Sequence, residues 1–274
     1  MSAPQVSEPI YNIPLQLWPA YAERTVVVRA TDPAALAATL ATADAERLLG
    51  VQLQALAADS EPLNAWQPGM PIELLMGDPE TEFPLLYHHT ELQDNHPVRV
   101  VIPARPGLAK AVKVALALEF PVRIDPGQPD AAALAELAAV LELYLRHSDV
   151  AQPVEYLHST LLGLYYDDPL PLWIAMDEEP GLLYQVADDG TESLPGRLAG
   201  VAPTTLARDA GPLAWIEQLL ATAPDCQSCA FRRVCGGYFK WPQRDYDCRG
   251  VQKLFTELSA AANELRRDLD TAPS

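Results

Sequence analysis

The first 225 residues of this 274-residue chain contain no cysteine, so every thiol lies in residues 226–274. The chain also lacks a run of about 18 uninterrupted apolar residues, which a membrane-spanning helix requires. Its opening residues lack a basic segment followed by an apolar one, which an export signal would show. We therefore expect a soluble, cytoplasmic protein with no membrane partner.

Basic residues are scarce: 19 Lys and Arg stand against 37 Asp and Glu, which gives a net charge of −18. Surfaces that bind nucleic acid or anionic lipid need excess positive charge, so we expect neither as a partner. The imbalance belongs to residues 1–225, which carry a net charge of −20. The cysteine-bearing end is the only part of the chain that is not acidic.

In residues 21–150, sequence patterns typical of strands alternate with patterns typical of helices. Because a parallel pair of strands needs a long crossover, this alternation predicts an α/β domain, either partial-barrel-like or an open parallel sheet. The predicted strands are 24–32, 51–56, 71–77, 97–104 and 121–127, and the predicted helices are 33–50, 105–120 and 128–147.

The pattern changes near residue 150. Residues 171–190 show two apolar runs around DEEPG and end in DDG, which predicts a hairpin, and 249–270 predict an amphipathic helix. The expected organisation is a flexible N-terminus (1–20), the α/β domain (21–150), a connecting region (151–220) and a small cysteine-rich domain (221–274).

The sequence LYHHTELQDNH gathers His88, His89 and His96 with two acidic residues. Imidazole and carboxylate groups together can ligate metal or exchange protons. Neighbouring histidines on a strand would point in opposite directions, so we expect a surface loop here.

Four cysteines stand at the spacing C-x2-C-x5-C-x12-C: Cys226, Cys229, Cys235 and Cys248. Four thiolates in a reducing compartment are a complete ligand set for tetrahedral zinc or for a [4Fe–4S] cluster. A zinc ribbon usually repeats C-x2-C, whereas only one such pair occurs here. The spacing favours the cluster and leaves zinc as the alternative.

Residues beside the cysteines in the sequence also favour a cluster. Gly236 and Gly237 have no Cβ, so the backbone can approach a bulky cluster and offer N–H groups to it. Arg232, Arg233 and Arg249 could offset the negative charge of a thiolate-bound cluster. The ordinary alternatives are that the glycines form a turn and that the arginines face solvent.

The segment CQSCAFRRVCGGYFKWPQRDYDCRGVQKLF, residues 226–255, resembles the SPASM domain of radical SAM enzymes that modify peptides and proteins. The resemblance implies that the four cysteines bind an auxiliary [4Fe–4S] cluster. Where the family has a further cysteine four positions after the third, this chain has Phe239. Only one auxiliary cluster can therefore be built.

The catalytic motif C-x3-C-x2-C of radical SAM enzymes is missing, so the chain cannot cleave SAM by itself. The resemblance implies an accessory or partner subunit in peptide or natural-product maturation, beside a radical SAM enzyme or a precursor peptide. The N-terminal part would be a degenerate radical SAM-like partial barrel or an unrelated α/β domain. Two alternatives remain: a binding protein whose four-cysteine site is purely structural, and an enzyme with a substrate-accessible iron.

Overall fold

The strands of the described chain join into one sheet, in the order β7-β6-β5-β4-β3-β2-β1-β8-β9. The computed structural model describes residues 8–44, 46–147, 150–179, 181–201 and 211–271. The strands are β1 Ile10–Pro14, β2 Thr25–Ala30, β3 Leu48–Leu53, β4 Ile72–Leu75, β5 Val98–Pro103, β6 Val122–Asp125, β7 Val154–Glu155, β8 Leu183–Val186 and β9 Glu192–Ser193.

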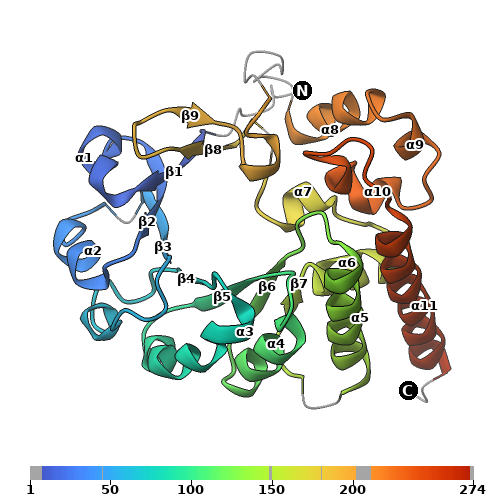
Figure 1. Ribbon diagram of the computed structural model, residues 1–274, viewed down its shortest axis with the longest axis horizontal. Helices are drawn as coiled ribbons and strands as arrows, with labels where there is room; N and C mark the ends of the chain where they lie inside the picture. The colour runs from blue at the N-terminus through green and yellow to red at the C-terminus, as the bar shows by residue number, and fades with distance from the viewer. Residues whose placement is uncertain (1–7, 45, 148–149, 180, 202–210, 272–274) are drawn as a thin grey trace.

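Strands β1 to β7 lie side by side in chain order and are parallel, which requires a crossover after each one. Figure 1 shows the sheet as an arc with α2, α3, α4 and α5 along its outer side. Strand β8 pairs parallel with β1, and β9 is antiparallel to β8. The α/β class and the parallel sheet predicted from the sequence are confirmed.

The described helices vary greatly in length. They are α1 Trp18–Tyr21, α2 Pro33–Thr39, α3 Pro79–Glu82, α4 Leu108–Ala117, α5 Ala131–Arg146, α6 Leu157–Tyr165, α7 Leu172–Ala175, α8 Gly211–Ala221, α9 Pro224–Gln227, α10 Arg232–Cys235 and α11 Arg249–Thr271. Short 3-10 helices are η1 Leu15–Leu17, η2 Glu61–Leu63, η3 Phe83–Asp94, η4 Gly196–Leu198 and η6 Tyr238–Lys240. None of the helices in the described ranges combines the length and apolarity needed to cross a bilayer.

Alternating burial along the strands creates the core. Ile72 and Leu74 of β4, and Val100 and Ile102 of β5, are fully buried, while the residues between them are partly exposed. Side chains of a strand point alternately to opposite faces, so one face of the sheet is apolar and packs against the helices. The opposite face carries the intervening residues.

Three expectations from the sequence differ from the structure. The helix predicted over 33–50 ends at Thr39, and residues 48–50 begin β3, whose pairing with β2 outweighs helix propensity. The first apolar run of 171–190 forms α7, and the hairpin is instead β8–β9 around the turn at 187–191. Strand β1 lies inside the segment expected to be flexible, of which residues 1–7 fall outside the described ranges.

The C-terminal helix forms as predicted. Val251, Leu254, Phe255 and Leu258 of α11 are buried, whereas Leu265 is exposed. The helix packs mainly against α6 and also against α5. Its buried side chains belong to the same apolar core as the sheet, so the cysteine-bearing end is anchored to the α/β layer.

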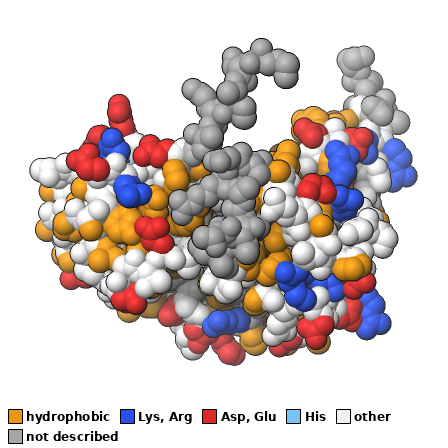
Figure 2. Space-filling model, turned by 90° about the horizontal axis from the view of Figure 1, so that it is seen from above, with side chains coloured by type: hydrophobic (Ala, Val, Ile, Leu, Met, Phe, Trp, Pro, Cys, Tyr) orange, Lys and Arg blue, Asp and Glu red, His pale blue; other side chains and the backbone are white. Residues whose placement is uncertain are grey.

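Charge is distributed unevenly over the visible surface. In Figure 2, most Lys and Arg side chains on this face lie at the right, over the C-terminal part of the chain. This agrees with the excess of acidic residues that the sequence places before residue 226.

The histidine segment lies on η3 and at its end, not on a surface loop. His89 is fully buried, with Nδ1 3.0 Å from Ser60 Oγ and Nε2 2.9 Å from the Leu56 carbonyl oxygen. Buried His96 likewise lies between the carbonyl oxygens of Met70 and Leu63, at 3.1 and 2.8 Å. Both imidazoles hold loops together, which is a structural role.

Burial lowers the pKa of His89, since desolvation disfavours the charged imidazole. As the pH falls below about 6.5, His89 becomes protonated in the unfolded chain while it is still neutral in the folded protein. The free energy of unfolding therefore decreases as the pH falls through this range. At pH 7.5 we expect His89→Gln to unfold at lower urea than wild type, and the difference to narrow by pH 5. A difference that stays constant between these pH values would contradict a buried neutral His89.

Candidate metal centre

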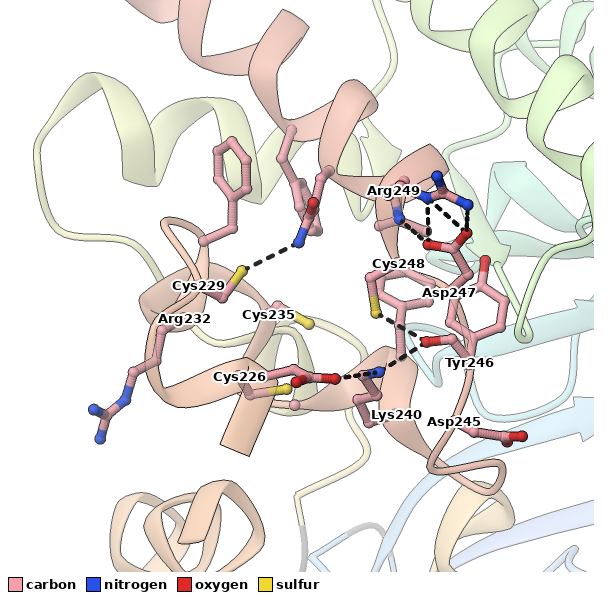
Figure 3. A pocket seen from close by; sticks show the side chains of 17 residues that line it. Cys226, Cys229, Arg232, Cys235, Lys240, Asp245, Tyr246, Asp247, Cys248 and Arg249 are labelled. Atoms are coloured by element: carbon pink, nitrogen blue, oxygen red, sulfur yellow. Dashed lines mark hydrogen bonds and ion pairs between the residues drawn. The ribbon is translucent and has the colours of Figure 1, made fainter. Parts of the chain in front are cut away.

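All four cysteines line one cavity of about 430 Å³. Cys226 lies on α9, Cys229 follows it in a turn, Cys235 ends α10, and Cys248 directly precedes α11. Figure 3 shows the four sulfur atoms arranged around a common space. The structure thus brings together thiols that are up to 22 positions apart in the sequence.

The four thiols are free, without a disulfide among them. Within the described ranges, no group of three or more His, Cys, Asp or Glu side chains is arranged to hold a single metal ion. The sulfur atoms nevertheless surround one common space, to which α9, α10 and the start of α11 each contribute.

The Cys235 thiol is strongly desolvated by its surroundings. Burial raises the pKa of this thiol to about 12, although backbone N–H groups of Phe239 and Gly237 act in the opposite direction by donating to the sulfur. Backbone donors of this kind favour the thiolate. The Cys235 thiol is therefore poorly suited to being a free anion.

Gln252 on α11 and Tyr246, which precedes this helix, contact two further thiols. Gln252 Nε2 donates to Cys229 Sγ at 3.6 Å, and Cys248 Sγ lies 3.8 Å from the Tyr246 carbonyl oxygen. Burial raises the pKa of Cys248 to about 11, with nearby Cys226 and Cys229 acting in the same direction and Lys240 opposing them. Three thiol side chains close together cannot all ionise without compensating positive charge.

Lys240 provides positive charge at this cavity. Its side chain is only 10% exposed, and Nζ donates to the Tyr246 carbonyl oxygen at 2.9 Å and lies 3.4 Å from Asp225 Oδ2. Lys240 is the foremost group acting to lower the pKa of both Cys226 and Cys248. Sequence analysis missed this residue, because nothing in its neighbourhood distinguishes it from a solvated lysine.

The arginines expected near the thiols all pair with acidic side chains. Arg232 borders the cavity, but its guanidinium points away and pairs with Glu217. Arg233 lies 3.9 Å from Asp167, and Arg249, which also lines the cavity, pairs with Asp247. The side chains of all three pairs are largely exposed.

The two glycines have different surroundings. Gly236 and Gly237 both have positive φ, at 57° and 80°, where a side chain would be strained. Gly237 lines the cavity and supplies an N–H group to Cys235. Gly236 is absent from the lining; its carbonyl oxygen accepts a 2.9 Å hydrogen bond from Trp173 Nε1, and a Cβ would lie 3.1 Å from that indole.

Three phenylalanines form the apolar part of the lining. Phe231, Phe239 and Phe255 line the cavity, and the Phe231 and Phe255 rings lie 5.4 Å apart. Buried Tyr156 contacts both Phe239 and Phe255 from the main core. This layer limits the access of water to one side of the thiols, a factor that influences the potential of a metal cluster.

The cavity is attached to the sheet through the loop that follows β6. Gln128 Nε2 donates to the carbonyl oxygens of Phe239 at 2.9 Å and Gln243 at 2.8 Å, and its Oε1 accepts from Gln243 N–H at 3.1 Å. Tyr246 Oη donates to the Pro129 carbonyl oxygen at 2.7 Å. These bonds fix the chain on both sides of Lys240 and directly before Cys248.

Comparison with protein-family models, with curated proteins and with solved structures finds no match for this chain.

We expect Gln128→Ala to lower the free energy of unfolding by about 1–3 kcal/mol, because it leaves backbone groups of residues 239 and 243 without their partner. Urea unfolding measures the change. The matched control is Gln227→Ala, which removes an exposed side chain with one long hydrogen bond, at 3.5 Å, and should stay within about 0.5 kcal/mol of wild type. Equal effects of the two substitutions would show that Gln128 does not anchor this segment.

Proposed function

We propose that this protein binds a single [4Fe–4S] cluster through Cys226, Cys229, Cys235 and Cys248. In this proposal it is an accessory or partner subunit in radical-SAM-type maturation of a peptide or natural product. The bound cluster would transfer electrons, position a substrate or stabilise the fold. A cytoplasmic location fits the proposal, since free thiols and iron–sulfur clusters persist in reducing compartments.

The observation that carries the proposal is the convergence of all four cysteines of the chain on one cavity. Four thiolates can hold either a [4Fe–4S] cluster or a tetrahedral zinc ion, and the single C-x2-C pair favours the cluster. The resemblance of residues 226–255 to a SPASM segment supports the same interpretation. The chain-order parallel strands β1 to β7 agree with a partial-barrel origin, although many folds alternate strands and helices.

The surrounding residues would serve the cluster in distinct ways. The N–H groups of Gly237 and Phe239 stabilise the Cys235 thiolate, and Gln252 orients Cys229. Lys240 supplies a cation that remains shielded from water. The phenylalanine layer excludes solvent from one side.

A purely structural site formed by the same four cysteines is the second candidate. The cysteines connect α9, α10 and the start of α11, and their surroundings are continuous with the main apolar core. A metal or cluster at this junction would hold three elements together, as structural metal sites do. This alternative assigns the function to a surface elsewhere in the chain.

Anaerobic reconstitution with iron and sulfide tests the cluster. We expect about four irons and four sulfides per chain, a broad absorbance band that bleaches with dithionite, and an EPR signal of the reduced state. Cys248→Ser should lose most of the band, whereas Ser228→Ala, in the turn between Cys226 and Cys229, should retain it. Stoichiometric zinc in the purified protein, together with no bleachable band, would refute the cluster assignment.

Removing the bound group distinguishes a centre that stabilises the fold from a cluster that transfers electrons. A structural centre should lower the melting temperature by about 10 °C or more when it is removed by chelation, since its binding energy contributes to folding. A cluster that serves electron transfer should be removable with a shift of only a few degrees. The measurement is differential scanning calorimetry of the loaded and stripped protein.

Lys240 should tune the potential of the reconstituted cluster. A shielded cation stabilises the more negative reduced state, so Lys240→Met should lower the midpoint potential and Lys240→Arg should largely preserve it. Arg232→Met is the control, because that guanidinium points away from the thiols. An EPR-monitored redox titration decides: equal potentials for the Lys240→Met and Arg232→Met proteins would exclude this role.

A further inference from the structure

A row of polar side chains crosses the face of the sheet opposite the apolar one. Each of the strands β1 to β6, and β8, contributes one residue to what we term the polar row: Asn12, Arg29, Gln52, Glu73, Arg99, Arg123 and Gln185. The strand register keeps them on a common face, since Asn12 pairs with Gln185, Gln52 with Glu73, and Glu73 with Arg99.

All residues of the polar row except Arg29 line a cavity of about 920 Å³, a size suited to ligands. The cavity lies apart from the cysteines, and no cysteine lines it. A closed barrel of parallel strands normally fills this position with branched apolar side chains. Polar groups that replace such a core must be hydrogen-bonded, and here they bond to one another.

Hydrogen bonds connect the polar row from β1 to β6. Asn12 Nδ2 donates to Gln52 Oε1 at 2.9 Å, and Gln52 Nε2 donates to Glu73 Oε2 at 2.7 Å. Arg123 donates to Glu73 Oε2 at 3.1 Å, and Arg99 pairs with Glu73 Oε1. The amide side chains of Asn12 and Gln52 are thus connected by hydrogen bonds to the Glu73 carboxylate, which also bonds two guanidinium groups.

The charged end of the row carries one more cation than it does anions. Glu73 and Arg123 are only 15% and 12% exposed, and with Arg99 they form a trio of net charge +1. Burial acts to raise the pKa of Glu73, but Arg123 and Arg99 outweigh it and lower that pKa. The trio remains charged, and it is neutralised by one of the four further carboxylates that line the same cavity: Glu119, Asp177, Glu178 and Glu179.

Asp177 supplies that anion from outside the sheet. Its Oδ2 accepts from Arg99 at 2.9 Å and from Arg123 at 3.2 Å, so one carboxylate oxygen bridges both arginines. Asp177 follows α7, has φ of 54° and is 62% exposed. An exposed residue with a strained backbone holds the arginine pair less firmly than buried Glu73 does.

We propose that the polar row is a binding site for an acidic peptide, whose carboxylate replaces Asp177 between Arg99 and Arg123. Asn12 and Gln52 would exchange the hydrogen bonds that they make within the row for bonds to the backbone amides of an extended peptide. Gln185 lines the same cavity. Strands lie about 4.8 Å apart, so the row from β6 to β1 has room for several peptide residues at about 3.3 Å each. The carboxylate can belong to a side chain or to the C-terminus.

This inference does not depend on the cysteine site, because its test uses no metal readout. The full-length protein is titrated by calorimetry with the probe peptide acetyl-AAEAA-amide, its glutamine counterpart acetyl-AAQAA-amide, and acetyl-AAAAA with a free C-terminus. Inorganic phosphate serves as a fourth titrant. Comparing the glutamate peptide with the free-C-terminus peptide shows whether the site prefers a side-chain carboxylate or a C-terminal one. Phosphate tests whether the site binds any anion.

Asp177→Asn should bind the glutamate peptide about tenfold more tightly than wild type, since the competing internal carboxylate is removed. Asp167→Asn is the matched control: it also changes an exposed aspartate of positive φ, at 57°, but one that faces Arg233. Arg99→Gln should weaken binding by about tenfold or more, and Arg99→Lys by less. Circular dichroism and thermal unfolding confirm that each variant folds.

We expect the glutamate peptide or the free-carboxylate peptide to bind more tightly than the glutamine peptide. We also expect binding to shift the NMR signals of the Arg99 and Arg123 Nε–H groups. Equal binding of the glutamate and glutamine peptides would overturn the proposal. So would equal affinities of wild type and Asp177→Asn, or binding of phosphate alone. Absence of binding to Asp177→Asn at millimolar peptide would also overturn it.

Discussion

The attachment of residues 237–248 to the loop after β6 determines the shape of the cysteine cavity. Gln128 bonds the backbone at Phe239 and Gln243, and Arg197 reaches the carbonyl oxygens of Gly127 at 2.9 Å and Trp241 at 3.4 Å. Arg197 also lies 3.8 Å from the Tyr238 ring centroid. Since these contacts are largely buried, the sheet acts as a fixed support for the short elements that carry the thiols.

Which positively charged side chain is shielded beside the thiols depends on the fold, and not on its distance from a cysteine along the sequence. Arg232 and Arg249 stand within three positions of a cysteine, yet each pairs with an acidic side chain on the surface. Lys240, five positions from the nearest cysteine, is the shielded cation at the cavity. A long side chain settles where its charge is best compensated, which a linear spacing does not reveal.

The two faces of the sheet differ in their side chains. The apolar face packs against helices, and the polar row on the other face requires a connected set of hydrogen bonds to offset desolvation. Its arginine pair and the cysteine cavity lie on different parts of the same framework. The proposed functions of the two sites are therefore separable by substitution.

The sequence by itself determined the α/β class, the strands β2, β4, β5 and β6, and the helix α5, because local periodicity and turn chemistry encode them. It also identified the four cysteines as one set from their number and spacing. Tertiary structure alone decided the position of β1 between β2 and β8, the end of α2 at Thr39, and the roles of Lys240, Gln128 and the polar row. These depend on contacts between residues far apart in the chain, whose energies no local pattern records.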